Sequence, residues 1–243
     1  MFWFGFNFTG DSVFNDMDVR MAWDLALDRR AIAGSLWPGV DVEPLIAEGY
    51  FNNMTFGYDE SLPKPEYNPD RARELLANST YDGRVIKLIG GGNNSMWEQL
   101  AMVLQDMVQS VGFKVDVTLE SGANFFAIQA NGDYDVFISQ ISFPDGIPLR
   151  QLNRILTNMD KQNYVKPELN AAIEGFLSEI SEAKREENAR KANRIIFEDK
   201  APHTAVVYKS TVYPINFGLT GIEFGKDTNF DFKFIDWDPT LVP

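Results

Sequence analysis

The fold is decided by residues 84–119, which read RVIKLIGGGNNSMWEQLAMVLQDMVQSVGFKVDVTL. Residues 84–89 predict a strand, and residues 95–111 predict a helix because their apolar side chains recur at helical spacing and Ser95 with Glu98 forms a capping box. Gly112 ends that helix, and residues 113–119 predict a second strand. A strand, a helix of this length and a second strand indicate a βαβ unit with parallel strands.

The same alternation extends along most of the chain. Further strands are predicted at 2–8, 134–141 and 205–209. Further helices are predicted from a cap at Asp16 to near residues 34–39, from Asn68-Pro69 through Leu76, and at 121–130, 149–159, 167–180 and 184–198. Residues 38–67, which contain four prolines, predict a long irregular segment. We therefore expect an α/β fold with a mixed, mostly parallel sheet and helices on both faces. From Thr211 onward, alternating aromatic residues predict an added β-ribbon rather than a separate domain.

Composition excludes several classes of protein. The 22 Lys and Arg residues face 35 Asp and Glu residues, so the net charge is −13 and nucleic-acid binding is not expected. The chain has no Cys and one His, which leaves no disulfide, no thiolate metal site and no basis for a Ser–His–Asp triad. We expect no cofactor, no bound metal and no enzymatic activity. Residues 1–4 lack the basic region of a signal peptide, so any export signal is expected outside this chain.

Two loops predict a ligand site. The Gly90–Ser95 loop lies between the end of a strand and the start of a helix, where free backbone N–H groups and the helix dipole point into the crevice of an open sheet. It lacks both the dinucleotide fingerprint and a Walker lysine, and a turn without function is the alternative. Residues 142–148 follow another strand end. There Phe143 offers an apolar wall and Asp145 an acceptor for an ammonium group, although Asp145 also suits an Asx turn.

A catalytic interpretation has little support. Asp133 and Asp135 flank Tyr134 at the start of a strand, which places both carboxylates on one face. A glycoside hydrolase would need such a pair in a cleft, with one pKa raised. A turn cap on a solvated face explains both residues more simply.

Five motifs, in order and at the expected spacing, resemble family 5 of the extracellular solute-binding proteins of ABC transporters. They are Phe14-Asn15-Asp16-Met17-Asp18-Val19-Arg20-Met21-Ala22, then Ala26-Leu27-Asp28-Arg29-Arg30-Ala31-Ile32, then Tyr67-Asn68-Pro69-Asp70-Arg71-Ala72-Arg73-Glu74-Leu75-Leu76, then Tyr81-Asp82-Gly83, and finally Gly132-Asp133-Tyr134-Asp135. The resemblance covers residues 7–210.

The resemblance implies a periplasmic-binding-protein type II lobe. Residues 1–210 would be the C-terminal lobe, and residues 211–243 a β-rich tail that returns to a first lobe absent here. The implied function is that of the substrate-binding component of an ABC importer, which captures oligopeptides or dipeptides and delivers them to the membrane permease. The implied location is extracytoplasmic, either in the periplasm or as a lipoprotein on a Gram-positive surface, and we expect a monomer.

Departures from the family pattern leave the solute open. Peptide binders of the family usually carry G-W-x-x-D-Y after the third strand, whereas Ile141, Pro144 and Asp145 align with its Trp, Asp and Tyr. Gly122 stands where the family often has Trp, and the Gly90–Ser95 loop has no Arg. The alternatives are a non-peptide solute, such as an oligosaccharide or a nickel chelate, and the sensing lobe of a cytoplasmic transcription regulator.

Topology and resemblance together predict one half of a binding site. The predicted residues share the C-terminal ends of the strands at 84–89 and 134–141. They are Gly91, Asn93, Asn94, Trp97, Asn124, Phe143 and Asp145. Backbone N–H groups and Asn amides would bind polar parts of the ligand, and Trp97 and Phe143 its apolar parts. Trp97 also belongs to the apolar stripe of its helix, which makes core packing its alternative.

Overall fold

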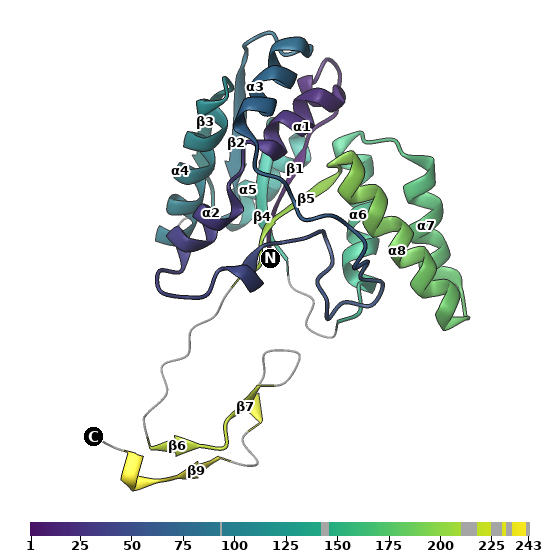
Figure 1. Ribbon diagram of the computed structural model, residues 1–243. Helices are drawn as coiled ribbons and strands as arrows, with labels where there is room; N and C mark the ends of the chain where they lie inside the picture. The colour runs from purple at the N-terminus through teal and green to yellow at the C-terminus, as the bar shows by residue number, and fades with distance from the viewer. Residues whose placement is uncertain (93, 142–145, 210–217, 225–229, 232–234, 242–243) are drawn as a thin grey trace.

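A five-stranded sheet forms the centre of the protein in the computed structural model, which describes residues 1–92, 94–141, 146–209, 218–224, 230–231 and 235–241 (Figure 1). The strand order is β3-β2-β4-β1-β5. The strands are β1 (Phe2–Phe6), β2 (Val85–Gly90), β3 (Lys114–Leu119), β4 (Val136–Gln140) and β5 (His203–Val207). Strand β2 is parallel to β3 and β4, whereas β1 is antiparallel to β4 and β5. Within this sheet β1 therefore runs against the other four strands, and the mixed, mostly parallel sheet is confirmed.

Helices cover both faces of the sheet, as predicted (Figure 1). One face carries α1 (Met17–Leu25), α2 (Arg29–Leu36), α3 (Pro69–Asn78) and α4 (Ser95–Ser110). The other carries α5 (Gly122–Asn131), α6 (Leu149–Gln162), α7 (Pro167–Ser178) and α8 (Glu182–Asp199). Short 3-10 turns, η1 (Val13–Asn15) and η2 (Glu43–Leu45), connect elements on the first face.

Strand β1 divides the apolar residues between two cores. Side chains alternate across a strand, so Phe2, Phe4 and Phe6 enter the core under α1–α4, while Trp3 enters the core under α5–α8. Gly5 shares the face of Trp3, and a Cβ atom there would lie 2.7 Å from the ring of Phe137. All five residues of β1 are buried, so the strand is an interior element.

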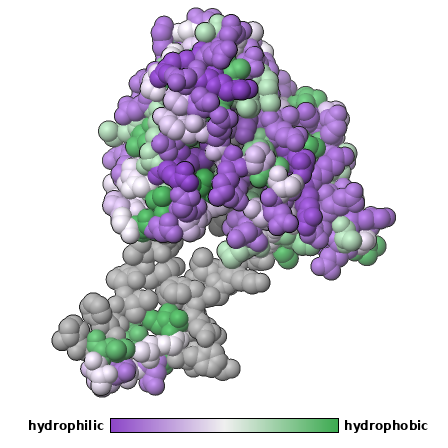
Figure 2. All heavy atoms as spheres, in the orientation of Figure 1, coloured by the Kyte–Doolittle hydropathy of each residue, from purple (hydrophilic) through white to green (hydrophobic). Residues whose placement is uncertain are grey.

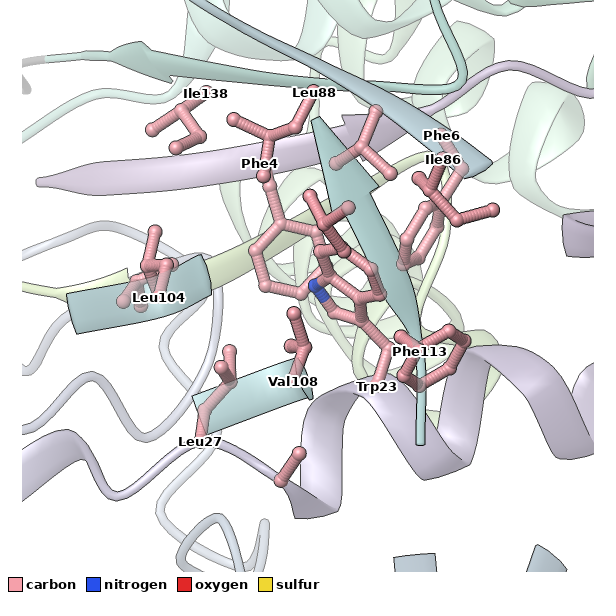
Figure 3. Packing of buried hydrophobic residues seen from close by; sticks show 14 of the residues in the cluster. Phe4, Phe6, Trp23, Leu27, Ile86, Leu88, Leu104, Val108, Phe113 and Ile138 are labelled. Carbon is pink, nitrogen blue, oxygen red and sulfur yellow. The ribbon is translucent and has the colours of Figure 1, made fainter. Parts of the chain in front are cut away.

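The first core is built around Trp23 of α1. Its indole meets the ring of Phe113 edge-on at 5.0 Å between centroids and that of Phe14 at 5.7 Å. Figure 3 shows Leu104 and Val108 of α4 in the same cluster, between the helices and the sheet. Aromatic pairs in this geometry stabilise a core beyond their buried area, by roughly 0.5–1.5 kcal/mol each.

Two helix starts differ from the prediction. The single helix predicted from Asp16 to near residues 34–39 is two helices, because Asp28 accepts a hydrogen bond from Ala31 N (3.0 Å) and caps α2, just as Asp16 caps α1. The predicted capping box at Ser95 is also wrong, since Asn94 is the N-cap of α4. The other predicted elements are present with ends moved by a few residues.

The described parts of the tail form two small strand pairs. Strand β6 (Leu219–Thr220) pairs with β9 (Asp236–Trp237), and β7 (Glu223–Phe224) pairs with β8 (Phe230–Asp231), followed by the turn η4 (Pro239–Leu241). This agrees with a predicted β-ribbon, and in Figure 1 the pairs lie away from the sheet and its helices. None of the described helices is long and apolar enough to span a membrane, and the face of the body in Figure 2 is largely hydrophilic.

Candidate ligand-binding site

The predicted site lies at one edge of the sheet. Because β2 and β4 are parallel, Gly90 pairs with Ile138 and the chain leaves both strands side by side. Gly91 N donates a hydrogen bond to Ile138 O (3.1 Å), which continues the pairing into the loop. Strand β1 is reversed, so Met1 lies at the same edge, where its carbonyl accepts from Ile141 N at 2.9 Å. The C-terminal ends of β2 and β4, which the sequence predicted to be neighbours, therefore lie side by side.

Neighbouring side chains pack closely against the glycines of the loop. A Cβ atom on Gly90 would lie 2.5 Å from Leu119, and one on Gly92 would lie 2.1 Å from Nε1 of Trp97. At Gly91 the ring of Phe125 would be 3.3 Å away. Side chains larger than hydrogen are thus excluded at two of these positions unless Trp97 or Leu119 moves. The loop backbone is held against the core, which disfavours a merely flexible turn.

Asn94 and Trp97 have structural roles at this edge. The side-chain oxygen of Asn94 accepts from Met96 N (3.2 Å) and Trp97 N (3.3 Å), so its carbonyl is used in capping α4. The NH2 group of Asn94 takes no part in that cap and is the group suited to a ligand. Trp97 is 4 % exposed, and its ring centroid lies 5.2 Å from that of Phe2, so its side chain packs in the core. The same indole packs against Gly92 of the loop.

Asn124 lies on the exposed first turn of α5. Its amide nitrogen donates to Glu120 Oε2 at 3.3 Å, and Asn124 itself is exposed while Glu120 is half-buried. Phe125, the next residue, is buried against Phe137, and Phe126 is 56 % exposed. The sequence analysis did not select Phe126 as a site residue. The one indication in the sequence was the pair Phe125-Phe126, because only one of two adjacent residues on a helix can face the core.

Three predicted residues, Asn93, Phe143 and Asp145, lie outside the described residues. The chain is described again from Gly146, whose carbonyl accepts from Phe56 N at 2.7 Å. The irregular segment 38–67 therefore borders the loop after β4, which the sequence did not indicate. Three exposed apolar residues flank this contact in the sequence: Met54 precedes Phe56, and Ile147 and Leu149 follow Gly146.

The carboxylates considered for catalysis serve the sheet instead. Asp133 forms an ion pair with Lys87 Nζ at 2.5 Å, and Asp135 Oδ2 accepts from Lys87 N at 2.7 Å. Both residues precede β4, at the end opposite the predicted site. Among the described residues no group of three or more His, Cys, Asp or Glu side chains is arranged to hold a metal ion.

Two surface hollows of several hundred Å³ lie away from these loops. One, of about 530 Å³, is bordered by Phe8, Arg20, Tyr164 and Lys166, and the other, of about 710 Å³, by Tyr58 and the outer face of α8. In the first, Arg20 already donates to the backbone oxygens of Phe14 (2.6 Å) and Asp199 (2.9 Å). Its guanidinium is thus occupied in joining α1 to α8.

This sheet edge brings together closely packed glycines, neutral amides and exposed apolar side chains. Residues 1–163 match the family model described as bacterial extracellular solute-binding proteins, family 5, middle region, and the chain belongs to this family. The resemblance in the sequence motifs is thereby confirmed.

Similar proteins support this assignment. The oligopeptide-binding protein OppA of Mycobacterium tuberculosis is 28 % identical over an alignment of 250 positions, which covers 90 % of this chain and 41 % of OppA. The structure of the oligopeptide-binding protein AppA of Bacillus subtilis with a nonapeptide has a TM-score of 0.73 at 20 % identity, covering 93 % of this chain and 48 % of AppA. The structure of NikA of Brucella suis with Fe(III)-EDTA has a TM-score of 0.77 at 18 % identity, covering 98 % of this chain and 51 % of NikA.

These structural likenesses confirm the fold, that of a type II periplasmic binding protein lobe. The chain spans about two fifths of the length of the curated relatives it matches.

Proposed function

We propose that this chain is the C-terminal ligand-binding lobe of a substrate-binding component of an ABC importer, which captures oligopeptides or dipeptides for a membrane permease. The observation that carries the proposal is the paired exit of β2 and β4, with Gly91 N bound to Ile138 O at one sheet edge. Ligands of open α/β sheets bind at such an edge. Family membership and the similarity to oligopeptide-binding proteins such as OppA support this solute class.

The residues at this edge suit a peptide. A peptide has alternating donors and acceptors along its backbone, which the amides of Asn94 and Asn124 complement without a buried charge. Phe126 and Met54 offer apolar contacts to its side chains. Of the residues outside the described ranges, Asn93 would add an amide, Phe143 an apolar wall and Asp145 an acceptor for the N-terminal ammonium group.

We further propose a division at about residue 210. Residues 1–210 form the lobe, and residues 211–243 return to a first lobe that supplies the opposite wall of the cleft. Strand β5 ends at Val207, which pairs with Phe2 on the same edge as the predicted loops, so the lobe would be left at the mouth of the proposed cleft. A hinge of this kind closes two lobes on a ligand.

The proposal includes location and partners. The protein acts outside the cytoplasm as a monomer that binds and releases its solute without chemical change. A net charge of −13 disfavours nucleic acid as a partner. Loss of the family's usual Asp, with Pro144 in its place, also admits a non-peptide solute such as an oligosaccharide or a metal chelate.

The test uses the longer protein that contains this chain together with its first lobe. Peptide mixtures of two to nine residues, an oligosaccharide mixture and a nickel chelate are titrated calorimetrically. The variants are Asp145→Ala, Asn124→Ala and Asn94→Ala, with Asn170→Ala on the exposed side of α7 as the matched control. Removing one hydrogen bond to a charged ligand group weakens binding by roughly 1.5–3 kcal/mol, or about 10- to 100-fold.

Peptide binding that Asp145→Ala or Asn124→Ala weakens, with Asn170→Ala unchanged, supports the proposal. Binding of the chelate or oligosaccharide alone would transfer the proposal to a non-peptide solute. Equal affinity in all variants would place the site on other loops. A helix-turn-helix encoded immediately before this lobe would instead identify a regulator.

A further inference from the structure

A carboxylate lies beside the loop of the predicted ligand site. Strand β3 is an outer strand of the sheet and runs parallel to β2 (Figure 1). Glu120 follows the last residue of β3, and its backbone N–H donates to Gly90 O at 2.9 Å. This hydrogen bond holds Glu120 at the edge where β2 ends, next to the loop that begins at Gly91.

The half-buried side chain of Glu120 reaches the start of α5. Its Oε2 atom accepts from the amide nitrogen of Asn124 (3.3 Å), which is on the exposed first turn of that helix. No Lys, Arg or His within the described ranges forms an ion pair with Glu120. An ionised carboxylate has about four acceptor positions, so a single neutral donor leaves most of this capacity for a ligand.

Basic side chains are absent from the segments that meet at this end of the edge. Residues 90–98 and 119–126 contain no Lys or Arg, and Glu98 and Glu120 are their only charged residues. The next basic residues after β4 and β5 are Arg150 and Lys209. In the sheet order β4 and β5 are two and four strands from β3, or about 10 and about 20 Å between strand axes. The end of the edge at β3 is therefore negative.

The start of α5 also leaves room beside this carboxylate. Gly122 has a left-handed backbone (φ 49°), and a Cβ atom there would meet no described atom of another element within 4 Å. Phe126, one turn further along α5, is 56 % exposed. An aliphatic chain thus has open space at Gly122 and an apolar ring one turn away.

We propose that Glu120 binds the positively charged side chain of a Lys or Arg residue in a peptide solute, which gives the site a preference for basic peptides. This inference rests on the proposed function and names a subclass of its solutes. The ammonium or guanidinium group donates to Glu120 in a charge-assisted hydrogen bond, and the aliphatic part of the side chain packs over Gly122 and Phe126. Such a pair is stronger in a closed cleft, from which water is excluded, than on an open surface.

Two other roles of Glu120 predict different results. The N-cap of α5, Ser121, makes no side-chain capping hydrogen bond, so the charge of Glu120 also favours the N-terminus of this helix. That interaction stabilises the fold without distinguishing a basic peptide from a neutral one. The N-terminal ammonium group of a peptide has the same chemistry as a Lys side chain, but every peptide with a free terminus carries it. Only binding of a charged side chain makes Glu120 discriminate between peptides that differ at one position.

The first experiment measures this discrimination in the longer protein that contains this chain together with its first lobe. Libraries of three-, five- and nine-residue peptides with free termini have one position fixed as Lys or as the uncharged norleucine, and uncharged residues elsewhere. Bound peptides are quantified by equilibrium dialysis and mass spectrometry. At one position we expect Lys to be preferred roughly 10-fold, the effect of one hydrogen bond to a charged group.

The second experiment compares two variants that remove the same charge from the same edge. Glu120→Gln should lower the preference for Lys to about 1, whereas Glu98→Gln, on the exposed first turn of α4, should leave it at roughly 10-fold. An equal fall in both variants would indicate a long-range effect of charge and overturn the proposal. Equal weakening of Lys and norleucine peptides by Glu120→Gln would overturn it too, because Glu120 would then serve the N-terminal ammonium group or the fold.

The wild-type protein alone can also contradict the inference. Neutral peptides that bind as tightly as their Lys counterparts at every position would overturn it and leave the proposed function intact, whether or not Glu120→Gln folds. Retention of no peptide from any library would contradict the proposed function and this inference with it.

Discussion

Nε2 of His203 lies 3.2 Å from the side-chain nitrogen of Asn158, inside the core between α6 and the sheet. An amide nitrogen only donates, so Nε2 accepts and the proton of the neutral ring is on Nδ1, 3.2 Å from the hydroxyl of Tyr50. The ring centroid is 3.8 Å from that of Trp3. Burial, helped by the charge of Arg154, holds the pKa of His203 well below its usual 6.5.

This imidazole makes the protein less stable in mild acid. Below pH 6.5 the unfolded chain binds a proton at His203 that the folded protein does not, so stability falls as the pH falls. The loss is about 1.4 kcal/mol per pH unit, or about 2 kcal/mol at pH 5. His203 is the sole histidine, so His203→Gln should remove this component. Urea unfolding between pH 7.5 and 5 measures it, and parallel curves for both proteins would contradict the assignment.

Two glycine-to-alanine changes should have opposite effects. In Gly92→Ala the new methyl group would overlap the indole of Trp97, so we expect destabilisation of about 1–3 kcal/mol and altered tryptophan fluorescence. Gly34 lies within α2, where the nearest other atom to a Cβ is 4.0 Å away. Gly34→Ala should therefore stabilise the protein by roughly 0.4–1 kcal/mol. Urea midpoints decide, and equal shifts would refute the close packing of the loop.

The cap of α4 can be separated from ligand binding. Asn94→Ala removes the acceptor for Met96 N and Trp97 N, and should cost about 1 kcal/mol of stability. Asn94→Asp retains an acceptor and adds a negative charge at a helix N-terminus, so its stability should match the wild type. Urea unfolding measures both, and an equal loss in the two variants would exclude a capping role.

Removal of the buried carboxylate should be severe. Asp24→Asn leaves Arg29 and Lys200 buried without the carboxylate that both bind, at an expected cost of about 3–5 kcal/mol. Asp70→Asn breaks an exposed ion pair with Arg73 and should have no measurable effect. Thermal and urea unfolding compare the two, and a mild effect of Asp24→Asn would mean that solvent reaches these side chains.

The periodicity of the sequence was sufficient for the sheet and helix order but not for local caps. Apolar spacing predicted α4 and its flanking strands because both faces of the sheet are covered. It did not separate α1 from α2, since Asp28 interrupts the helix through its own side chain without interrupting the apolar pattern. Asn94 and Ser95 are both good caps, and the choice between them depends on backbone angles.

The candidate site was predictable in position and less so in role. The topology of parallel strands placed the Gly90–Ser95 loop correctly at the edge of the sheet. The orientation of Trp97, in contrast, depends on its packing against Phe2, which lies 95 residues earlier in the chain. The contact of Gly146 with Phe56 likewise joins distant segments. Such long-range contacts leave no local pattern in a single sequence.

The central place of β1 constrains how the protein reaches its folded state. Phe2 is paired with both Gln140 and Val207, so the strand gains its neighbours only after nearly all of the lobe is available. Pairing over such separations has a large loop-closure entropy, which makes folding slow. Until then the aromatic segment Phe2–Phe6 is exposed to aggregation. A chaperone that holds the emerging chain should therefore raise the yield of refolding more than a change of temperature does.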